Sequence, residues 1–502
     1  MALGFYTQMK LKVKDVDIST GGRLVAILNH KDATRLDVHE MDRIIISNGS
    51  KFETVLVNIA RNGKIIPGGT IGVFEELMSV LKLKNSDEVE IRIARKPLSI
   101  QFIKKKLDGQ RLSKKEIDQI VWDIVHNKLS QVELTYFVAA CYTNMMNTQE
   151  TIFLTKSMVE HGEMLKINKY PIVDKHSIGG IPGNRTTMVI VPIIASAGFY
   201  IPKTSSRSIT SPAGTADTME VLANVSLPLK KIKDIVLKTH GCIVWGGALN
   251  LAPADDKIIG VEKPMEIDAE SQLIASIMAK KHSVSSTHIL IDIPTGKDAK
   301  VKNTIEANEL KLRFQKIGKM LKKHIKVIIT DGSCPIGNGI GPALEARDVL
   351  WLLKRDPRRP IDLEKKCLMM CSRIFEIVGI KGGYRKSLEL LNSGKAYEKL
   401  VEIIKAQGGS EIPAEGIKIG KMSFEVLSKK SGTIRGIDNM AISRIARIAG
   451  APHEKGAGIY LHRHIGERVK RNEKLFSVYA EGEHEFQYAG DTVKECNAFE
   501  IK

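Results

Sequence analysis

The sequence contains few aromatic residues and few cysteines. Aromatic side chains make up 5% of its 502 residues, and the six cysteines are scattered, with only Cys367 and Cys371 close together. This spacing places both sulfurs on one face of a helix, but no second pair completes a zinc site. We therefore expect reduced cysteines in the core and no bound metal.

Hydrophobic segments long enough to cross a membrane are also missing. The longest apolar stretch runs from Met188 to Tyr200, is interrupted by Pro192 and is too short to span a bilayer. The amino-terminal residues "MALGFYTQMKLKV" lack the apolar core of a secretory leader. We therefore expect a cytoplasmic protein with no membrane partner.

Negative charge is scarce relative to positive charge. Lys and Arg total 76 against 57 Asp and Glu, which gives a formal net charge of +19. Nucleic-acid binding is one interpretation, but the basic residues are spread along the chain and are not interleaved with aromatics. A field of this sign also attracts phosphates and nucleotides, and a Lys/Glu-rich solvated surface is the third alternative. Charge alone does not separate the three.

The chain divides into four blocks, of which the first two differ sharply in pattern. Residues 1–93 contain short β-type runs separated by Asn-Gly and Gly-Gly turns, which predicts a β-rich assembly module whose strand edges pair subunits. Residues 94–168 predict a helical domain, which residues 255–285 are expected to join. Two capping boxes support these helices, at Ser113-x-x-Glu116 and Ser130-x-x-Glu133.

The third block, residues 169–415, alternates short apolar strands with amphipathic helices. The expected strands are "PIVDKH", "GFYIPKT", "GCIVWGG", "HILIDIP" and "KVIITDG". The expected helices lie near Thr186–Ser196, Leu229–Thr239, Asn308–Lys322 and Pro342–Lys354. This alternation predicts an α/β domain with a mainly parallel sheet. In residues 416–502 β-type runs return, which predicts a β-rich α+β domain at the carboxyl end.

A glycine-rich stretch, "VDKHSIGGIPGNRTT", follows the first strand of the third block. Its three glycines, Gly179, Gly180 and Gly183, allow a close approach of the backbone to a ligand, and a helix start favours anions. Lys175 and Ser177 add a cation and a hydroxyl donor. A plain strand-to-helix turn is the alternative, but the polar neighbours favour phosphate.

A second stretch, "SSRSITSPAGTADTMEVL", concentrates hydroxyl groups around one arginine before a helix. Short hydroxyl donors and a rigid guanidinium suit a phosphate, and Gly214 allows the turn that makes them converge. The alternative is a Ser/Thr-rich loop that merely caps the helix after Asp217, which explains one or two of the hydroxyls but not all of them together with Arg207. The candidate ligands of this stretch are Ser206, Arg207, Ser208, Ile209, Thr210, Ser211 and Thr215.

Two further stretches are less specific. In "DAESQLIASIMAKK", Ser276 and Lys280 share a helix face with Asp268 nearby, an arrangement that suits a heterocyclic base or simply an exposed charged helix. The glycines of "PIGNGIGPALEARDVL" miss the spacing of a dinucleotide-binding loop. We assign this stretch a tight turn, and the chain no cofactor.

Taken in order, these motifs resemble the thymidine and pyrimidine-nucleoside phosphorylase family from about Leu98 onwards. "KHSIGG", "SSRSITSPAGTADTME", "LAPAD" and "SQLIASIMAKK" match its successive motifs. The extra amino-terminal module is similar to that of the archaeal AMP phosphorylases in this family. The resemblance implies a helical domain facing an α/β domain across a cleft, with phosphate on the α/β side and the base on the helical side.

The resemblance also implies roles for single residues. Ser276 and Lys280 fall at base-binding positions. The residues that fall at phosphate-side positions are Lys175, Ser177, Gly180, Thr186, Ser205 and Thr215.

The sequence departs from the pyrimidine pattern in three places. A run that is glycine-rich in thymidine phosphorylases is here Ser208–Ala213, and Gly-Asp after the first loop becomes Pro182-Gly183 followed by Asn184 and Arg185. Both changes favour the binding of more negative charge. The arginine that would contact a pyrimidine is missing near Val261, which argues against a pyrimidine preference.

These observations predict phosphorolysis of AMP to adenine and ribose 1,5-bisphosphate, with CMP and UMP as possible substrates, by a homo-oligomer. Asp268 is the candidate general acid, and Lys175, Arg207 and Lys300 are the candidate cations for two phosphates. The alternatives are a pyrimidine-nucleoside phosphorylase, a magnesium-dependent phosphoribosyltransferase using Asp255-Asp256, and a basic RNA-binding protein.

Overall fold

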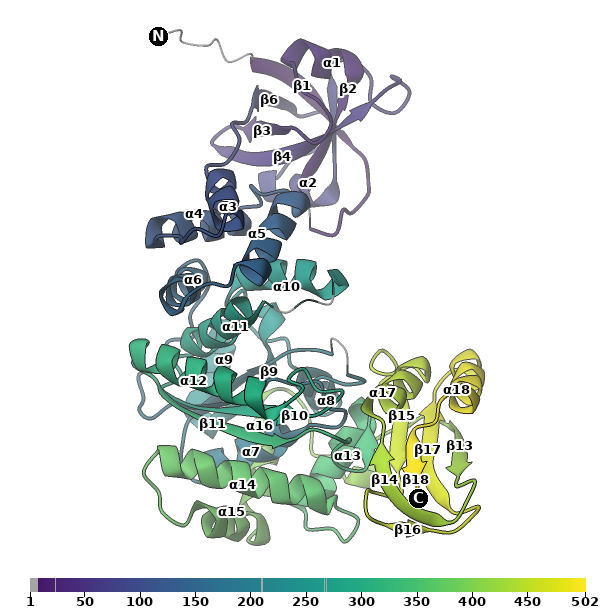
Figure 1. The fold of residues 1–502 in the computed structure, drawn as a ribbon. Coiled ribbons are helices and arrows are strands. Elements are labelled where there is room, and N and C mark those ends of the chain that lie inside the picture. Colours follow the sequence, from purple (N-terminus) through teal and green to yellow (C-terminus); the bar gives the residue numbers. More distant parts are fainter. Residues whose placement is uncertain (1–7, 23, 209–210, 266, 268) are drawn as a thin grey trace. The chain divides into compact units, whose positions relative to one another are not determined.

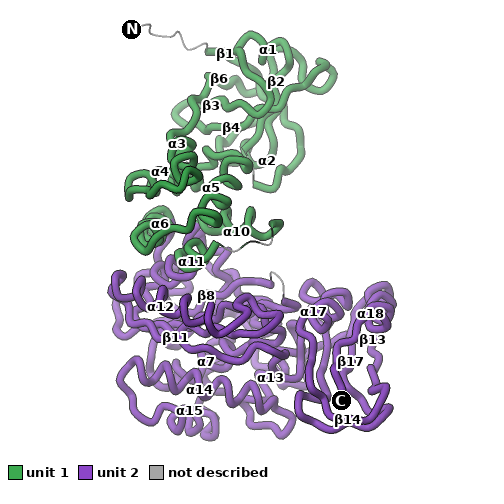
Figure 2. The backbone as a smooth tube through the Cα atoms, viewed as in Figure 1, with its two compact units in different colours: residues 1–161, 253–275 green, residues 162–252, 276–502 purple. Residues whose placement is uncertain are grey.

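The computed structural model describes residues 8–22, 24–208, 211–265, 267 and 269–502. The chain forms two compact units (Figure 2). The first consists of Met1–His161 with Pro253–Ala275, and the second of Gly162–Ala252 with Ser276–Lys502. The described part of the chain contains no helix that is both long and apolar enough to cross a membrane.

The first unit begins with a closed β-barrel, in which the strand order is β1-β5-β2-β4-β3-β6. Alternate side chains such as Leu11 and Val13 are buried inside it. Two short helices that the sequence did not predict, α1 (His30–Leu36) and α2 (Glu75–Leu81), interrupt the strands. The strands are β1 (Gln8–Asp15), β2 (Val25–Asn29), β3 (Arg43–Asn48), β4 (Lys51–Ala60), β5 (Thr70–Val73) and β6 (Glu88–Ile93).

Closure of this barrel corrects the expectation that strand edges of the amino-terminal module pair subunits. Each described strand is hydrogen-bonded on both sides, so the module offers no free strand edge for pairing subunits. The prediction of edge pairing was therefore wrong. Short β-type runs do not reveal whether a sheet closes.

Helices make up the rest of the first unit. Both predicted capping boxes are confirmed, at Ser113 with Glu116 and at Ser130 with Glu133. Arg43 of the barrel donates to the carbonyl of Lys128 at 3.0 Å and pairs with Glu133, so one arginine links barrel and helices. The helices are α3 (Ser99–Leu107), α4 (Lys114–Val125), α5 (Gln131–Thr143), α6 (Thr148–Glu160) and α10 (Pro253–Met265).

The second unit is built on five parallel strands. Strands β11, β10 and β7 form one ladder and β8 and β9 another, and a parallel bridge between Ile172 and Tyr200 joins them. The order is thus β11-β10-β7-β8-β9, so the chain reverses direction across the sheet between β7 and β10. The strands are β7 (Val173–Ser177), β8 (Ile201–Ser205), β9 (Gly241–Trp245), β10 (His288–Thr295) and β11 (His324–Asp331).

Helices cover both faces of this sheet (Figure 1). Helix α7 is buried on all sides, since every residue from Thr186 to Ala195 is buried, and this accounts for its apolar run from Met188 to Ala195. Helices α7, α9, α12 and α13 were predicted, whereas α14 to α16 were not. The helices are α7 (Thr186–Ser196), α8 (Thr215–Glu220), α9 (Leu229–Thr239), α12 (Thr304–Met320), α13 (Pro342–Leu353), α14 (Ile361–Ile377), α15 (Gly383–Asn392) and α16 (Lys395–Ala406), together with α11 (Glu270–Ser283), which begins in the first unit and ends in the second.

The carboxyl-terminal part of the second unit contains two small sheets, β12-β15-β17-β13 and β16-β14-β18, with helices α17 (Asn439–Ile448) and α18 (Glu483–Glu495). The predicted fold class, a β-rich module followed by helical, α/β and α+β parts, is confirmed. The strands are β12 (Gly339–Ile340), β13 (Met422–Leu427), β14 (Gly432–Ile437), β15 (Gly458–Leu461), β16 (Arg468–Val469), β17 (Lys474–Ala480) and β18 (Phe499–Ile501).

The glycine that precedes α13 makes a close contact with this carboxyl-terminal part. Gly341 has φ of +122°, and a Cβ there would overlap the carbonyl oxygen of Ala457. Gly341→Ala should lower the free energy of unfolding by about 2–3 kcal/mol, measured by urea denaturation. Gly379→Ala is the matched control, because Gly379 has φ of +84° but open space around it, and it should cost about 1 kcal/mol. Equal losses in the two variants would contradict this account.

Candidate functional site

The candidate site lies at the carboxyl edge of the five parallel strands. Ser177 at the end of β7 lies opposite Asp292 of β10, to which its hydroxyl donates at 2.9 Å. The sheet order reverses between these two strands, and ligands of open α/β sheets bind at such a point. The predicted loops after β7 and β8 leave the sheet at this edge, as does the loop after β10.

The loop after β7 has the backbone that its glycines predicted. Gly179 and Gly180 have φ of +93° and +92°, and a Cβ on Gly180 would lie 3.2 Å from the backbone nitrogen of Lys300. Lys175 is buried and donates to the hydroxyl of Thr186 at 2.7 Å, across the base of the loop. The predicted residues Lys175, Gly180 and Lys300 therefore lie around one turn.

Burial strongly affects the cations of this edge. It lowers the pKa of Lys175 to about 8, opposed by the carboxylate of Asp292. Burial, reinforced by Lys281, Lys203 and Lys175, holds the pKa of His176 well below its ordinary value. The uncharged form of His176 is therefore favoured, and its ring can donate or accept a hydrogen bond.

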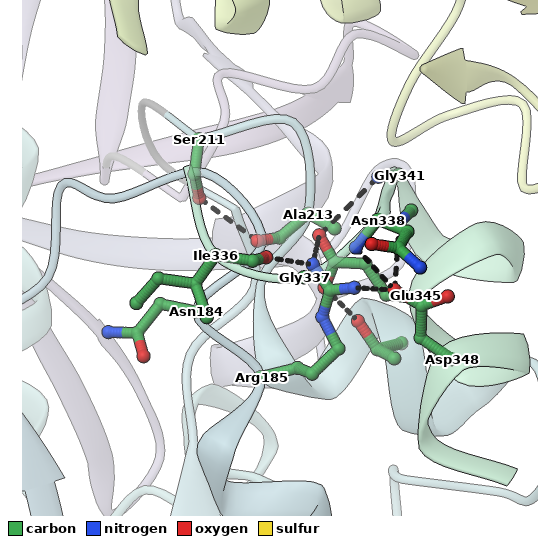
Figure 3. A network of polar contacts seen from close by, with 12 residues as sticks. Asn184, Arg185, Ser211, Ala213, Ile336, Gly337, Asn338, Gly341, Glu345 and Asp348 are labelled. Carbon is green, nitrogen blue, oxygen red and sulfur yellow. Dashed lines mark hydrogen bonds and ion pairs between the residues drawn. The ribbon is translucent and has the colours of Figure 1, made fainter. Parts of the chain in front are cut away.

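Arg185 fixes the far end of the glycine-rich loop (Figure 3). Its guanidinium is fully buried, lies 3.1 Å from Asp348 and 3.6 Å from Glu345, and donates to the carbonyl of Ile336 at 3.3 Å. Two carboxylates therefore surround this one cation. Arg185 therefore adds no uncompensated positive charge here, and the expectation that the missing carboxylate at Pro182-Gly183 favours more negative charge stays a prediction.

The same carboxylates organise the neighbouring turn and helix. Asp348 accepts the backbone N–H groups of Asn338 at 2.9 Å and Gly339 at 2.8 Å. Glu345 accepts the hydroxyl of Thr218 in α8 at 3.0 Å. Helix α8, which follows the hydroxyl-rich loop, is thereby tied to α13, whose Glu345 also pairs with Arg185 at the end of the glycine-rich loop.

The hydroxyl-rich loop after β8 is held by its own groups. The hydroxyl of Ser208 donates to the carbonyl of Ser211, and that of Ser211 to the carbonyl of Ala213. Asp217 accepts the backbone N–H groups of Ser208 at 2.7 Å and Gly214 at 2.9 Å. Ile209 and Thr210 lie outside the described residues.

Other predicted residues of this loop are placed at its two ends. The carbonyl of Ser206 accepts the N–H of Ala216 at 3.3 Å, and Thr215 is the first residue of α8. The hydroxyl of Ser205, at the end of β8, is buried and has no hydrogen-bond partner. A buried hydroxyl without a partner is uncommon and fits a ligand position.

Arg207 is bound to carboxylates. It donates to Glu220 at 2.7 and 2.5 Å and to Asp217 at 3.0 Å, and it stacks on Trp245 at 4.7 Å. Lys455 from the carboxyl-terminal part also donates to Glu220 at 2.7 Å. Arg207 and Lys455 together lower the pKa of Glu220 to about 2, so this carboxylate stays charged. The guanidinium predicted to bind phosphate is thus oriented by two internal acids.

The remaining predicted residues belong to the segment around α11. Ser276 and Lys280 lie one turn apart on that helix. Asp268, the predicted general acid, lies outside the described residues. Asp255 and Asp256 occupy the first turn of α10 in the first unit, and the described residues contain no group of three or more acidic, histidine or cysteine side chains suited to a metal ion.

Sequence reasoning missed several charged residues of the same edge. Lys281 pairs with buried Asp174 at 2.9 Å, and Lys366 lies 3.6 Å from Asp292. Lys203 lies in β8 and is also buried. The sequence feature that could have revealed Lys203 is its position inside an otherwise apolar strand pattern, "GFYIPKT", two residues before the hydroxyl-rich loop.

Models of known families match most of the chain. Residues 100–162 match the helical bundle domain of a glycosyl transferase family, and residues 169–397 match the α/β domain of that family. Residues 433–500 match the pyrimidine nucleoside phosphorylase C-terminal domain. The three matches follow one another in the order of the described parts.

Several archaeal proteins are similar over nearly their whole length. The AMP phosphorylase of Pyrococcus furiosus is 45% identical over 95% of this chain and 94% of its own. AMP phosphorylase 1 of Archaeoglobus fulgidus is 45% identical over 92% of each chain, and the AMP phosphorylase of Methanococcoides burtonii is 41% identical over 98% and 97%. These matches include the amino-terminal barrel.

One solved structure shares the fold of part of the chain. The anthranilate phosphoribosyltransferase of Thermus thermophilus superposes with a TM-score of 0.52 at 16% identity, covering 61% of this chain and 99% of its own. At this identity the likeness concerns the fold alone.

The buried cluster around Arg185 yields a stability prediction. Arg185→Met should lower the free energy of unfolding by about 3–5 kcal/mol, because it leaves Glu345 and Asp348 buried without their cation. Arg373→Met, which breaks an exposed pair with Glu376, should cost less than about 0.5 kcal/mol. Denaturant titration measures both. A loss as small in Arg185→Met as in the control would refute the anchoring role.

Proposed function

Because the chain belongs to the AMP phosphorylase family, we propose that it catalyses phosphorolysis of nucleoside 5′-monophosphates. In this reaction AMP and phosphate give adenine and ribose 1,5-bisphosphate. The observation that supports this proposal most strongly is the carboxyl edge of the sheet, where lysines gather beside a glycine-rich loop and a hydroxyl-rich loop. Such an edge suits a reaction with two phosphate groups.

The attacking phosphate would bind at the loop after β7. The ammonium of Lys175, the hydroxyl of Ser177 and the N–H groups around Gly180 would donate to it, and Thr215 at the start of α8 would add another donor. An oxygen of phosphate attacks the anomeric carbon as the bond to the base breaks. The positive charge that develops on the ribose is stabilised by the adjacent phosphate anion.

The 5′-phosphate of the nucleotide would bind at Ser206–Ser211. In the structure the hydroxyls of Ser208 and Ser211 donate to carbonyls of the same loop, so they need only rotate to donate to a phosphate. Arg207 would act either by direct pairing or by holding the loop through Asp217 and Glu220. Lys300, beside Gly180, supplies a further cation.

The base would be held by Ser276 and Lys280 and protonated by Asp268. Adenine leaves most easily when its ring nitrogen receives a proton as the glycosidic bond breaks. A carboxyl group can supply that proton if burial raises its pKa. These three roles follow from the family resemblance and from the position of the first two residues on α11.

A pyrimidine-nucleoside phosphorylase is the second candidate function. It is favoured by the match of residues 433–500 to the carboxyl-terminal domain of that name. Thymidine and uridine are therefore tested beside the nucleotides.

Self-association and a cytoplasmic setting complete the proposal. Helix α5 carries exposed apolar side chains, Val132, Tyr136 and Tyr142, of the kind that pack against another copy of a chain. A cytoplasmic setting fits an enzyme whose substrates are AMP and phosphate.

AMP should be cleaved with a kcat/KM at least hundreds of times that of adenosine. Charge-assisted hydrogen bonds to the 5′-phosphate are worth roughly 1.5–3 kcal/mol each, and adenosine lacks that phosphate. Release of free adenine, measured by chromatography, compares the two substrates. Arg207→Ala should narrow the difference by slowing AMP, whereas Arg373→Ala on the surface should leave it unchanged. Equal efficiency with adenosine and AMP would favour a nucleoside phosphorylase instead.

Asp268→Asn should retain AMP binding and reduce kcat by about two to four orders of magnitude, since an amide cannot donate a comparable proton. Single-turnover kinetics at saturating phosphate measure the loss. Unchanged turnover would remove Asp268 from the mechanism.

A further inference from the structure

Strands β7 and β8 both end in the tripeptide pattern Lys-x-Ser. The parallel bridge between Ile172 and Tyr200 sets the register of these two neighbours. Three residues beyond the bridge lie Lys175 on β7 and Lys203 on β8, and each lysine is followed two residues later by a serine. Residues two apart in a strand point to the same face, so each strand directs a lysine and a serine to one side.

The first of these pairs belongs to the proposed phosphate site. In the second pair, the family resemblance places Ser205 at a phosphate-side position, whereas Lys203 has no assigned role. Lys203 is only 5% exposed. Its ammonium nitrogen donates to the carbonyl of Thr204, the next residue in the strand. The serine of this pair, Ser205, has the buried hydroxyl without a partner described above. Both polar groups of the second pair therefore suit a ligand.

The nearest carboxylate is already occupied. Asp174 on β7 pairs with Lys281 of α11 at 2.9 Å and accepts the hydroxyl of Ser286 at 3.0 Å. Its other oxygen accepts the backbone N–H of Lys175 at 2.7 Å. Among the described residues, Lys203 has no ion pair of its own within 4 Å. Asp174 therefore neutralises Lys281, and the second buried lysine, Lys203, lacks a counter-charge of its own.

The groups around Lys203 determine its charge. From β7 it is faced by Asp174 and Lys175, from α11 by Lys281, and from β9 by the buried thiol of Cys242. Burial, with the neighbouring Lys281, holds the pKa of Lys203 well below its ordinary value, against the weaker pull of Asp174. Without an anion nearby, burial therefore disfavours the charged form of Lys203.

We propose that Lys203, together with Ser205, binds a phosphate dianion of the substrates and takes up one proton from solvent as the anion enters. The anion supplies the missing counter-charge, so the protonated form becomes the stable one. The proton returns to solvent when the product leaves, and no other bond changes. The dianion is inorganic phosphate or the 5′-phosphate of the nucleotide, and this inference rests on the proposed function.

Isothermal titration calorimetry on the full-length enzyme tests the proposal. AMP alone and inorganic phosphate alone are each titrated at pH 7.5 in two buffers of different ionisation enthalpy, and the difference in heat gives the number of protons taken up. When one of the two ligands binds, the wild type should take up about one proton more per bound ligand than the Lys203→Met variant does. That ligand should also bind the variant about 10- to 100-fold more weakly. The ligand that shows the difference identifies the anion.

Two further variants separate binding from structure. Lys203→Arg, which stays protonated at every accessible pH, should bind the anion better than Lys203→Met but without proton uptake. Lys316→Met on the exposed face of α12 should behave like the wild type. Lys203→Met should unfold at the wild-type temperature or above it, because a folded-state pKa below that of the unfolded chain makes Lys203 destabilising at neutral pH.

The result that would overturn the proposal is equal proton uptake and equal affinity for both ligands in the wild type and in Lys203→Met. Its failure is distinguishable from failure of the proposed function. If the wild type cleaves no nucleotide but Lys203→Met still loses proton uptake on phosphate binding, Lys203 is an anion ligand of another reaction. If AMP is cleaved and proton uptake does not depend on Lys203, only this inference fails.

Discussion

The buried ion cluster of Arg185, Glu345 and Asp348 is the interaction on which the rest of the site depends. It joins the end of the glycine-rich loop to α13, and through Thr218 it joins both to α8. The hydroxyl-rich loop ends at α8, so one cluster sets the spacing between two candidate phosphate loops. Removal of one of these three charged side chains leaves the others buried without full compensation. Single substitutions in the cluster are therefore expected to destabilise the fold strongly.

The charges around this framework are of two kinds. Arg185 and Arg207 are fully compensated by carboxylates and hold loops in place. Lys175 and Lys203 are buried with too few carboxylates, and burial lowers the pKa of both. A site of this kind is incomplete until anions enter it. The positive charge of the sequence therefore indicates an anion site at the places where lysines are buried together. The total net charge alone does not indicate one.

Much of the fold could be predicted from the sequence, because strands and helices of the α/β part have clear periodicity. Helix α7 was found from its apolar run, and the capping boxes at Ser113 and Ser130 from local spacing. Closure of the barrel and the partners of Arg185 could not be predicted, since both depend on contacts between distant segments. Lys203 was missed because a single lysine in an apolar strand gives no sign of its neighbours.

In the proposed reaction the chain transfers the 5-phosphoribosyl group of a nucleotide from its base to inorganic phosphate. Phosphorus NMR of the full-length enzyme with AMP and inorganic phosphate tests it directly, because both phosphorus atoms of the product are visible. The account predicts that the signals of AMP and phosphate decrease together while two equal signals of one ribose bisphosphate appear. Unchanged AMP, or the appearance of pyrophosphate, would contradict it.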